Sequence, residues 1–106
     1  MKILNTYKDG KLTLFFKGEV DHHSAKAARA DIEDLLDEYL PRDCAIELSG
    51  VTFMDSSGIA VILRIYKRMN DIGGRAWIEN VPPQALRVID ASGIDRIVRV
   101  TTTVKE

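Results

Sequence analysis

The sequence predicts a single α/β domain with a mixed β-sheet. Short apolar segments with strand character alternate with amphipathic segments of helical period over the last two thirds of the chain. The length of 106 residues fits one hydrophobic core, so we expect one domain over residues 1–106. The composition, 45% hydrophobic and 29% charged, is that of an ordinary globular protein.

The first segment predicts a β-hairpin. Leu12, Leu14 and Phe16 alternate with Lys11, Thr13 and Phe15, as in a strand with one face on a core. Asp9-Gly10 is a strong turn signal directly before them. We therefore expect this strand to pair with the segment Ile3–Tyr7.

A surface helix is expected between Ser24 and Leu40. Its apolar residues recur at helical spacing, and charged residues, Lys26 and Arg29 among them, lie largely between these positions on what we interpret as a solvated face. Pro41 ends the helix. The pair His22-His23 is placed in a polar loop before it. The apolar stripe consists of Ala28, Ile32, Leu35, Leu36 and Tyr39.

A second strand and helix follow. Cys44–Leu48 reads as a fully buried strand, and a loop from Ser49 is expected to lead to a serine-rich motif. The segment Ser57–Asp71 has one apolar face and ends at Gly73-Gly74, a plausible left-handed cap. This segment carries the strongest helical pattern in the chain.

The remaining segments predict a strand, a short helix and a closing strand. Ala76–Ile78 is the strand, and Pro82-Pro83 starts a helix through Ile89, because proline suits a first helical position. Ile97–Val100 is expected to close the sheet. We interpret Ser92-Gly93-Ile94, which repeats the order Ser-Gly-Ile of residues 57–59, as a chance echo, with the glycine acting as a helix cap.

Charge and apolar content exclude several classes of function. The net charge is −1 and basic residues are scattered, so we expect no direct nucleic-acid partner and infer that the partner is another protein. The single cysteine, Cys44, cannot form an internal disulfide, which favours a reducing compartment. The longest apolar run, Ile59–Leu63, is too short for a membrane span. We therefore expect a cytoplasmic protein.

The motif Met54–Ala60 puts a hydroxyl at the expected start of the second long helix. Asp55-Ser56-Ser57-Gly58 is ordinary helix-capping chemistry, yet the same position tolerates a phosphate, because a helix amino terminus offers free N–H groups and a positive dipole end. Gly58 is expected to leave open space for a partner's close approach, so that Gly58→Leu stays folded. The acidic side chain of Asp55 adds a negative charge near the hydroxyl.

One enzymatic alternative remains open. A hydrolytic triad of Ser57, His22 and Asp55 is conceivable, although the glycine that a nucleophile elbow needs two residues before the serine is absent. The histidines and Cys44 have none of the spacings of a metal site. No nucleotide-binding glycine pattern is present, so no cofactor is expected.

The segment Phe53–Ile59 resembles the phosphorylation motif of bacterial anti-sigma factor antagonists, the STAS domain family. Gly18–Ala25 resembles the family's stretch before its first helix, and the double histidine is most similar to the sporulation-type antagonist. Ile72–Gly74, Val81–Pro83 and Ala91–Ile94 also fall in the family's order. The resemblance covers essentially the whole chain, with Ile59-Ala60 where members often show Leu-Gly.

The resemblance implies a small sheet with helices packed mainly on one side, and a non-enzymatic regulatory role. Ser57 would be the phosphorylated residue and Ser56 its unmodified neighbour. The implied partners are an anti-sigma factor that is also a serine kinase, and a PP2C-type phosphatase that reverses the modification. The unphosphorylated form would bind the anti-sigma factor and free the sigma factor, and phosphorylation would release it.

The expected partner-binding residues lie around that serine. They are Asp21, His22, Asp55, Ser56 and Gly58. A second possibility within the family is a STAS scaffold that serves another signalling pathway.

Overall fold

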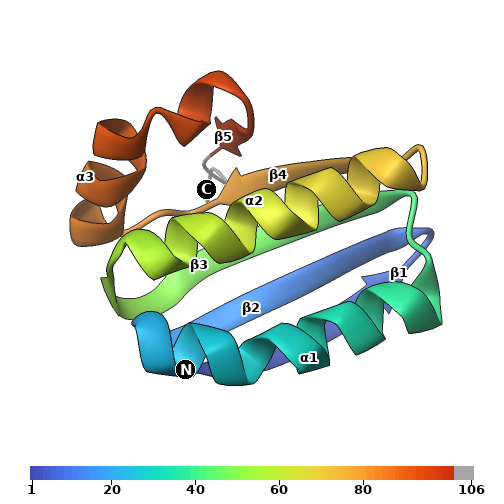
Figure 1. The fold of residues 1–106 in the computed structure, drawn as a ribbon. Helices are drawn as coiled ribbons and strands as arrows, with labels where there is room; N and C mark the ends of the chain where they lie inside the picture. The colour runs from blue at the N-terminus through green and yellow to red at the C-terminus, as the bar shows by residue number, and fades with distance from the viewer. Residues whose placement is uncertain (102–106) are drawn as a thin grey trace, which may run out of the picture.

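The computed structural model describes residues 1–101, which form a five-stranded sheet with three α-helices and one 3₁₀ turn. The strands and helices alternate after an initial hairpin, as the sequence pattern predicts (Figure 1). In chain order the elements are β1 (Lys2–Lys8), β2 (Lys11–Val20), α1 (His22–Tyr39), β3 (Asp43–Met54), α2 (Ser56–Asp71), β4 (Arg75–Glu79), α3 (Pro83–Ser92), η1 (Ile94–Arg96) and β5 (Arg99–Thr101).

The sheet is mixed, with the strand order β1-β2-β3-β4-β5. β1 pairs antiparallel with β2 through the predicted turn, where Asp9 and Gly10 both have positive φ angles of 52° and 81°. The other three pairings are parallel, and each needs a crossover connection. The hairpin prediction and the predicted α/β class are therefore confirmed.

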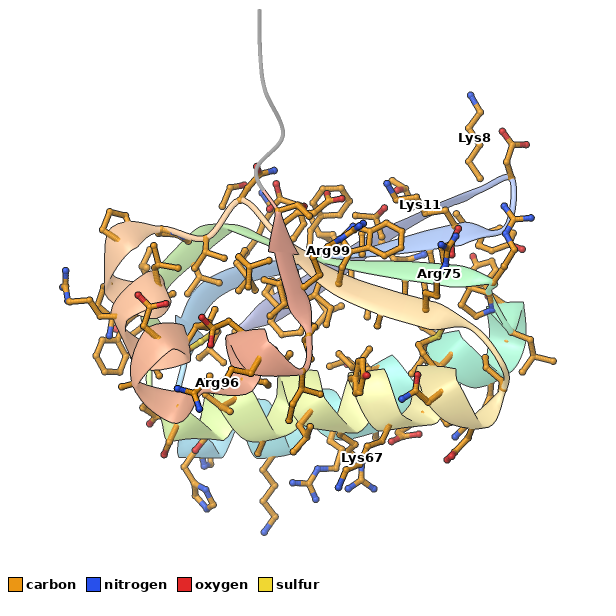
Figure 2. All side chains as sticks on the ribbon, turned by 90° about the horizontal axis from the view of Figure 1, so that it is seen from above. Lys8, Lys11, Lys67, Arg75, Arg96 and Arg99 are labelled. Carbon is orange, nitrogen blue, oxygen red and sulfur yellow. The ribbon has the colours of Figure 1, made fainter. Side chains whose placement is uncertain are left out.

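The long helices cover one side of the sheet. α1 and α2 lie side by side over it and α3 lies beside the start of α2, while in the described residues no helix covers the opposite side (Figures 1 and 2). On that opposite face Lys11 and Arg99 lie over the Trp77 ring, at 5.4 and 5.8 Å from its centroid. The expected arrangement, with helices mainly on one side, is confirmed.

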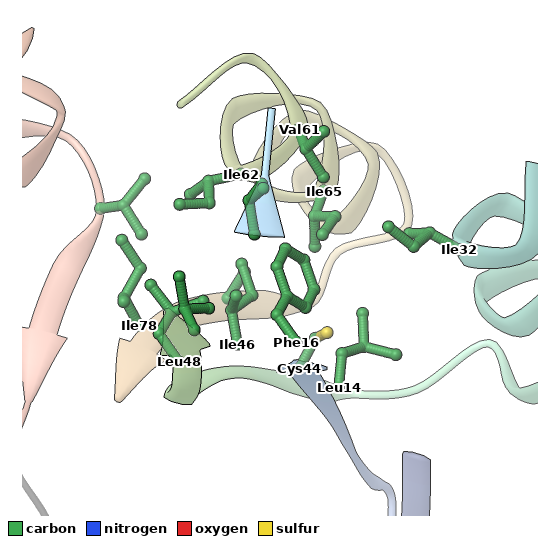
Figure 3. Close-up of a cluster of buried hydrophobic side chains, with 14 of the residues drawn as sticks. Leu14, Phe16, Ile32, Cys44, Ile46, Leu48, Val61, Ile62, Ile65 and Ile78 are labelled. Carbon is green, nitrogen blue, oxygen red and sulfur yellow. The ribbon is translucent and has the colours of Figure 1, made fainter. Parts of the chain in front are cut away.

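The core lies between the sheet and the helices. Alternate residues of β2 and β3 enter it and meet the apolar stripes of α1 and α2 (Figure 3). Cys44 is completely buried there, and desolvation raises the pKa of its thiol to about 12. The thiol is therefore neutral at ordinary pH and packs as a small apolar side chain.

The loop expected from Ser49 to the serine motif does not exist. β3 continues to Met54, because residues 50–54 pair with the end of β2 after shifts in register on either side of Lys17 and Gly18. Gly50 fits this close approach, since a Cβ there would lie 3.0 Å from the Lys17 side chain. The serine motif thus follows directly on a sheet strand, which fixes its position.

The helix boundaries also differ in detail from the expectations. α1 begins at His22, so the two histidines are its first residues and not a polar loop. Gly93 caps α3 with a φ of 76°, as predicted, but the closing strand is Arg99–Thr101 because the chain first makes a 3₁₀ turn. No helix in residues 1–101 is both long and apolar enough to cross a membrane.

Candidate functional site

The sheet brings the two halves of the predicted site together. β2 and β3 are parallel neighbours, and their last residues, Val20 and Met54, are register partners. The Asp55 amide donates to the Val20 carbonyl oxygen over 3.1 Å, which ties the two strand ends. α1 and α2 therefore begin next to each other at one edge of the sheet (Figure 1).

α1 begins with a complete capping box. The Asp21 carboxylate accepts the Ser24 amide over 2.8 Å, and the Asp21 amide donates to the Ser24 hydroxyl oxygen over 3.0 Å. That hydroxyl also donates to the Glu19 carbonyl oxygen over 2.9 Å. The hydrogen bond from the Ser24 amide lowers the pKa of the Asp21 carboxyl below its ordinary value of 3.8, and the Ser24 side chain lowers it further.

α2 begins at Ser56, one residue earlier than expected, and its N-cap is Asp55. The Asp55 carboxylate accepts the Ser57 amide over 2.8 Å, and the Asp55 carbonyl oxygen accepts the Gly58 amide over 3.0 Å. The Ser57 hydroxyl is not the cap, and within residues 1–101 it forms no hydrogen bond. It is a half-buried hydroxyl with no structural role in the helix start.

Gly58 does not face open space. It is buried, and a Cβ at this position would lie 2.7 Å from Cγ and 2.9 Å from Sδ of Met54, which is itself completely buried. The expectation that this glycine leaves room for a partner is therefore wrong. Its lack of a side chain lets the first turn of α2 pack on the end of β3.

The two serines line different cavities. Ser57 lies on the α1 side of the helix, in a cavity of about 350 Å³ with His22, Lys26 and Arg29. Ser56 lies on the α3 side, in a cavity of about 540 Å³. The other residues of that second cavity are Ile59, Gln84, Arg87, Val88, Ala91 and Ser92. The site therefore has a basic flank beside Ser57 and a largely apolar flank beside Ser56.

Sequence reasoning missed Gln84. Its side-chain amide accepts the Met54 amide and donates to the Met54 carbonyl oxygen, both over 2.8 Å, and so joins α3 to the strand end that precedes the site. The two residues are 30 positions apart, and no local pattern marks such a contact.

The sequence pattern predicts a solvated face for Lys26 and Arg29, whereas in the structure they line the cavity beside Ser57. The signal that places them beside the site is their spacing: His22, Lys26 and Arg29 follow each other by four and three residues, which puts them on one face of α1. That face borders α2.

The geometry offers little to the hydrolase alternative. Ser57 and His22 line one cavity, but no hydrogen bond joins the serine hydroxyl to a histidine in residues 1–101. The third triad candidate, Asp55, accepts the Ser57 amide instead of orienting an imidazole. The same residues contain no group of three or more His, Cys, Asp or Glu side chains placed to hold a metal ion.

Comparison with known proteins gives a consistent result. The STAS domain family model matches residues 2–106. An anti-sigma F factor antagonist of Paenibacillus polymyxa is 33% identical over 91 residues, which cover 86% of this chain and 78% of that protein.

Solved structures share the fold. The anti-sigma factor antagonist SpoIIAA in its unphosphorylated form has a TM-score of 0.83 at 21% identity, covering 98% of this chain and 90% of that one. The phosphorylated form of the Bacillus cell fate determinant SpoIIAA has a TM-score of 0.75 at 21% identity, with coverage of 98% and 93%. By the family match and the curated relative, this chain belongs to the STAS domain family.

Proposed function

We propose that this protein is a cytoplasmic anti-sigma factor antagonist that is switched by phosphorylation of Ser57. The observation that carries the proposal is the free, half-buried Ser57 hydroxyl at a helix start that Asp55 already caps. A modification there leaves every hydrogen bond of the helix start in place. The name of the Paenibacillus polymyxa relative and the two forms of SpoIIAA support the same assignment.

The proposed cycle involves four proteins: this chain, an anti-sigma factor, a sigma factor and a phosphatase. The unphosphorylated chain binds an anti-sigma factor with serine kinase activity and thereby releases the sigma factor. The kinase then phosphorylates Ser57 and the complex dissociates. A PP2C-type phosphatase removes the phosphate and restores binding.

The binding surface is the region around Ser57 at the carboxyl-terminal ends of β2 and β3. Asp21, His22, Asp55 and Ser56 surround this serine where α1 and α2 begin, and all four are at least partly exposed. Gly58 contributes by letting α2 pack on Met54, which sets the height of the serine above the sheet.

A charge change is sufficient for such a switch. A phosphate adds about −1.5 to −2 charge at neutral pH. An interface that closes over this edge would have to desolvate that charge, and leaving it unpaired costs several kcal/mol. A loss of about 4 kcal/mol weakens binding about a thousandfold.

The phosphorylation site is tested by incubating the purified chain with ATP and the kinase that co-purifies with it, followed by phosphopeptide mapping. We expect the phosphate on Ser57. A phosphate on Ser56, Ser92 or Asp55 would contradict the residue assignment.

The direction of the switch is tested with two variants. Ser57→Ala should retain binding to the anti-sigma factor, whereas Ser57→Asp should lose most of it because it adds a charge at the same place. Calorimetry gives both affinities, and melting temperatures in the same buffer show that both variants are folded. Equal, tight binding by both would instead favour a STAS scaffold whose phosphorylation serves another purpose.

A further inference from the structure

Three basic side chains of α1 share a cavity with the proposed phosphorylation site. His22, Lys26 and Arg29 line the cavity of about 350 Å³ on one side, and Ser57 lies on the other with Ala60 and Val61. The two helices run in parallel from the same sheet edge, so these residues all lie near the two helix starts (Figure 1). A group added to the Ser57 oxygen would therefore extend beside three potential cations.

The amino terminus of α2 has little left to offer a phosphate. The Ser57 amide is already bonded to the Asp55 carboxylate, and the Gly58 amide to the Asp55 carbonyl oxygen. A phosphate on Ser57 would also lie close to the negative charge of Asp55. Two of the first three amides of α2 are thus occupied, so we look to another element for most of the charge that balances the phosphate.

The cations of α1 are available for this purpose. In residues 1–101 neither Lys26 nor Arg29 forms an ion pair or a side-chain hydrogen bond. Farther along the same seam the charges are balanced: Glu33 of α1 bonds to Arg64 and Arg68 of α2 over 2.8 and 3.1 Å, and Asp37 of α1 also pairs with Arg68. Lys26 and Arg29 are therefore the unpaired cations among the described residues of this seam, and they lie towards the end that contains Ser57.

We propose that Lys26 and Arg29 bind the phosphate of phosphorylated Ser57, so that α1 and α2 form an internal phosphate-binding site. This inference rests on the proposed phosphorylation of Ser57. Arg29 supplies a planar donor group suited to two phosphate oxygens, and Lys26 supplies a compact charge. The phosphate joins the two helices, so the phosphorylated chain is more stable than the unmodified one.

Charged groups of both signs lie around the position of a phosphate on Ser57. His22 adds a positive charge when it is protonated, while Asp21 and Asp55 at the two helix starts oppose the phosphate. Lys26 and Arg29 line the cavity, whereas Asp21 and Asp55 do not and their carboxylates are bonded to backbone amides, so we expect the two cations to stabilise the phosphate dianion.

The test uses the full chain with phosphoserine incorporated at position 57 during translation, so no kinase is needed. A ³¹P NMR titration measures the second pKa of the phosphate, which is about 6 when unperturbed. In the phosphorylated double variant Lys26→Gln/Arg29→Gln we expect a pKa about one pH unit higher than in the phosphorylated wild-type sequence. The rise in melting temperature on phosphorylation should largely disappear in the same variant.

A matched control removes two positive charges elsewhere. Lys8→Gln/Lys67→Gln changes the net charge equally, but neither lysine lines the cavity. Figure 2 shows Lys8 at the end of β1 and Lys67 on α2. This control should keep the low phosphate pKa and the stabilisation. Equal phosphate pKa values in the wild-type sequence and Lys26→Gln/Arg29→Gln, with both folded, would overturn the proposal. Because the phosphate is installed without a partner, a kinase that modifies another residue would contradict the proposed function and leave this measurement unaffected.

Discussion

α1 and α2 both begin after an aspartate at the end of a parallel strand, yet they use their serines differently. Asp21 and Asp55 are the two N-caps, and each carboxylate accepts a backbone amide over 2.8 Å. In α1 the third residue, Ser24, returns a hydrogen bond and completes a capping box. In α2 the third residue is Gly58, and the hydroxyl is moved to the second residue, Ser57.

The difference separates a structural serine from one that is free for chemistry. The Ser24 hydroxyl oxygen has both an amide donor and a carbonyl acceptor, so a modification there would break the start of α1. The Ser57 hydroxyl contributes to no cap, so the helix start does not depend on it. The bare Gly58 in turn lets α2 pack directly on Met54.

The largest effect is expected where the two helix starts differ in side-chain volume. Gly58→Leu should lower the free energy of unfolding by about 3 kcal/mol, since its side chain has to enter a filled core beside Met54. This reverses the sequence-based expectation that the variant stays folded at little cost. Denaturant unfolding monitored by circular dichroism measures the change.

A double-mutant cycle makes the cause specific. Met54→Ala removes the side-chain atoms that a Cβ at position 58 would meet, so Gly58→Ala should cost less in that background than in the wild-type sequence. Additive effects of the two changes would show that Gly58 is required for another reason.

Much of the fold follows from local sequence patterns. The Asp9-Gly10 turn, the long apolar faces of the two helices and the proline start of α3 are each encoded within a few residues, and the structure confirms them. What local patterns could not show is the extension of β3 to Met54. The pair Ser49-Gly50 predicts a loop by itself, and this segment is a strand only because it pairs with the end of β2.

The site was predictable in part for the same reason. The capping motif that begins at Asp55 could be found from its own segment, whereas Asp21 was expected near the site only from the family resemblance and its role as the cap of α1 was not predicted. The parallel sheet places the two aspartates together. The packing role of Gly58 could not be predicted, because it depends on contact with the buried Met54 side chain and not on the solvent-facing side of the helix start. The contact of Gln84 with Met54 likewise joins segments that no local pattern relates.

The cap of α2 provides the next largest effect. Asp55→Ala removes the acceptor of the Ser57 amide and should lower the free energy of unfolding by about 1.5 kcal/mol. Asp55→Asn keeps an oxygen acceptor at the same place and should lose much less. If both variants lose the same amount, the charge of Asp55 and not its hydrogen bond stabilises the helix start.

The two serines give the direct test of the comparison. Ser24→Ala removes an acceptor from the Asp21 amide and a donor to Glu19, and should cost about 1 kcal/mol of stability. Ser57→Ala should change the stability by less than about 0.5 kcal/mol, because it breaks no hydrogen bond. Thermal melts of the two variants measure the difference, and a larger loss for Ser57→Ala would show that its hydroxyl has a structural role.

The smallest effect concerns the acid titration of Asp21. Its pKa lies below 3.8, chiefly because the carboxylate accepts the Ser24 amide and secondly because of the Ser24 side chain. A carboxyl group with a lowered pKa in the folded state stabilises the fold above its unfolded pKa of 3.8, and this contribution is lost as the pH falls through the folded value. Ser24→Ala should therefore raise the pKa of Asp21 towards 3.8, as NMR titration of the side-chain carboxyl carbon would show. The pH range over which Asp21 contributes to acid-dependent stability should become narrower. Ser57→Ala is the matched control, since Ser57 does not contact the capping box of α1, and it should leave the pKa of Asp21 unchanged. A pKa of Asp21 that stays low without the Ser24 hydroxyl would mean that the backbone amide alone holds the carboxylate, and the two helix starts would then differ less than their hydrogen bonds indicate.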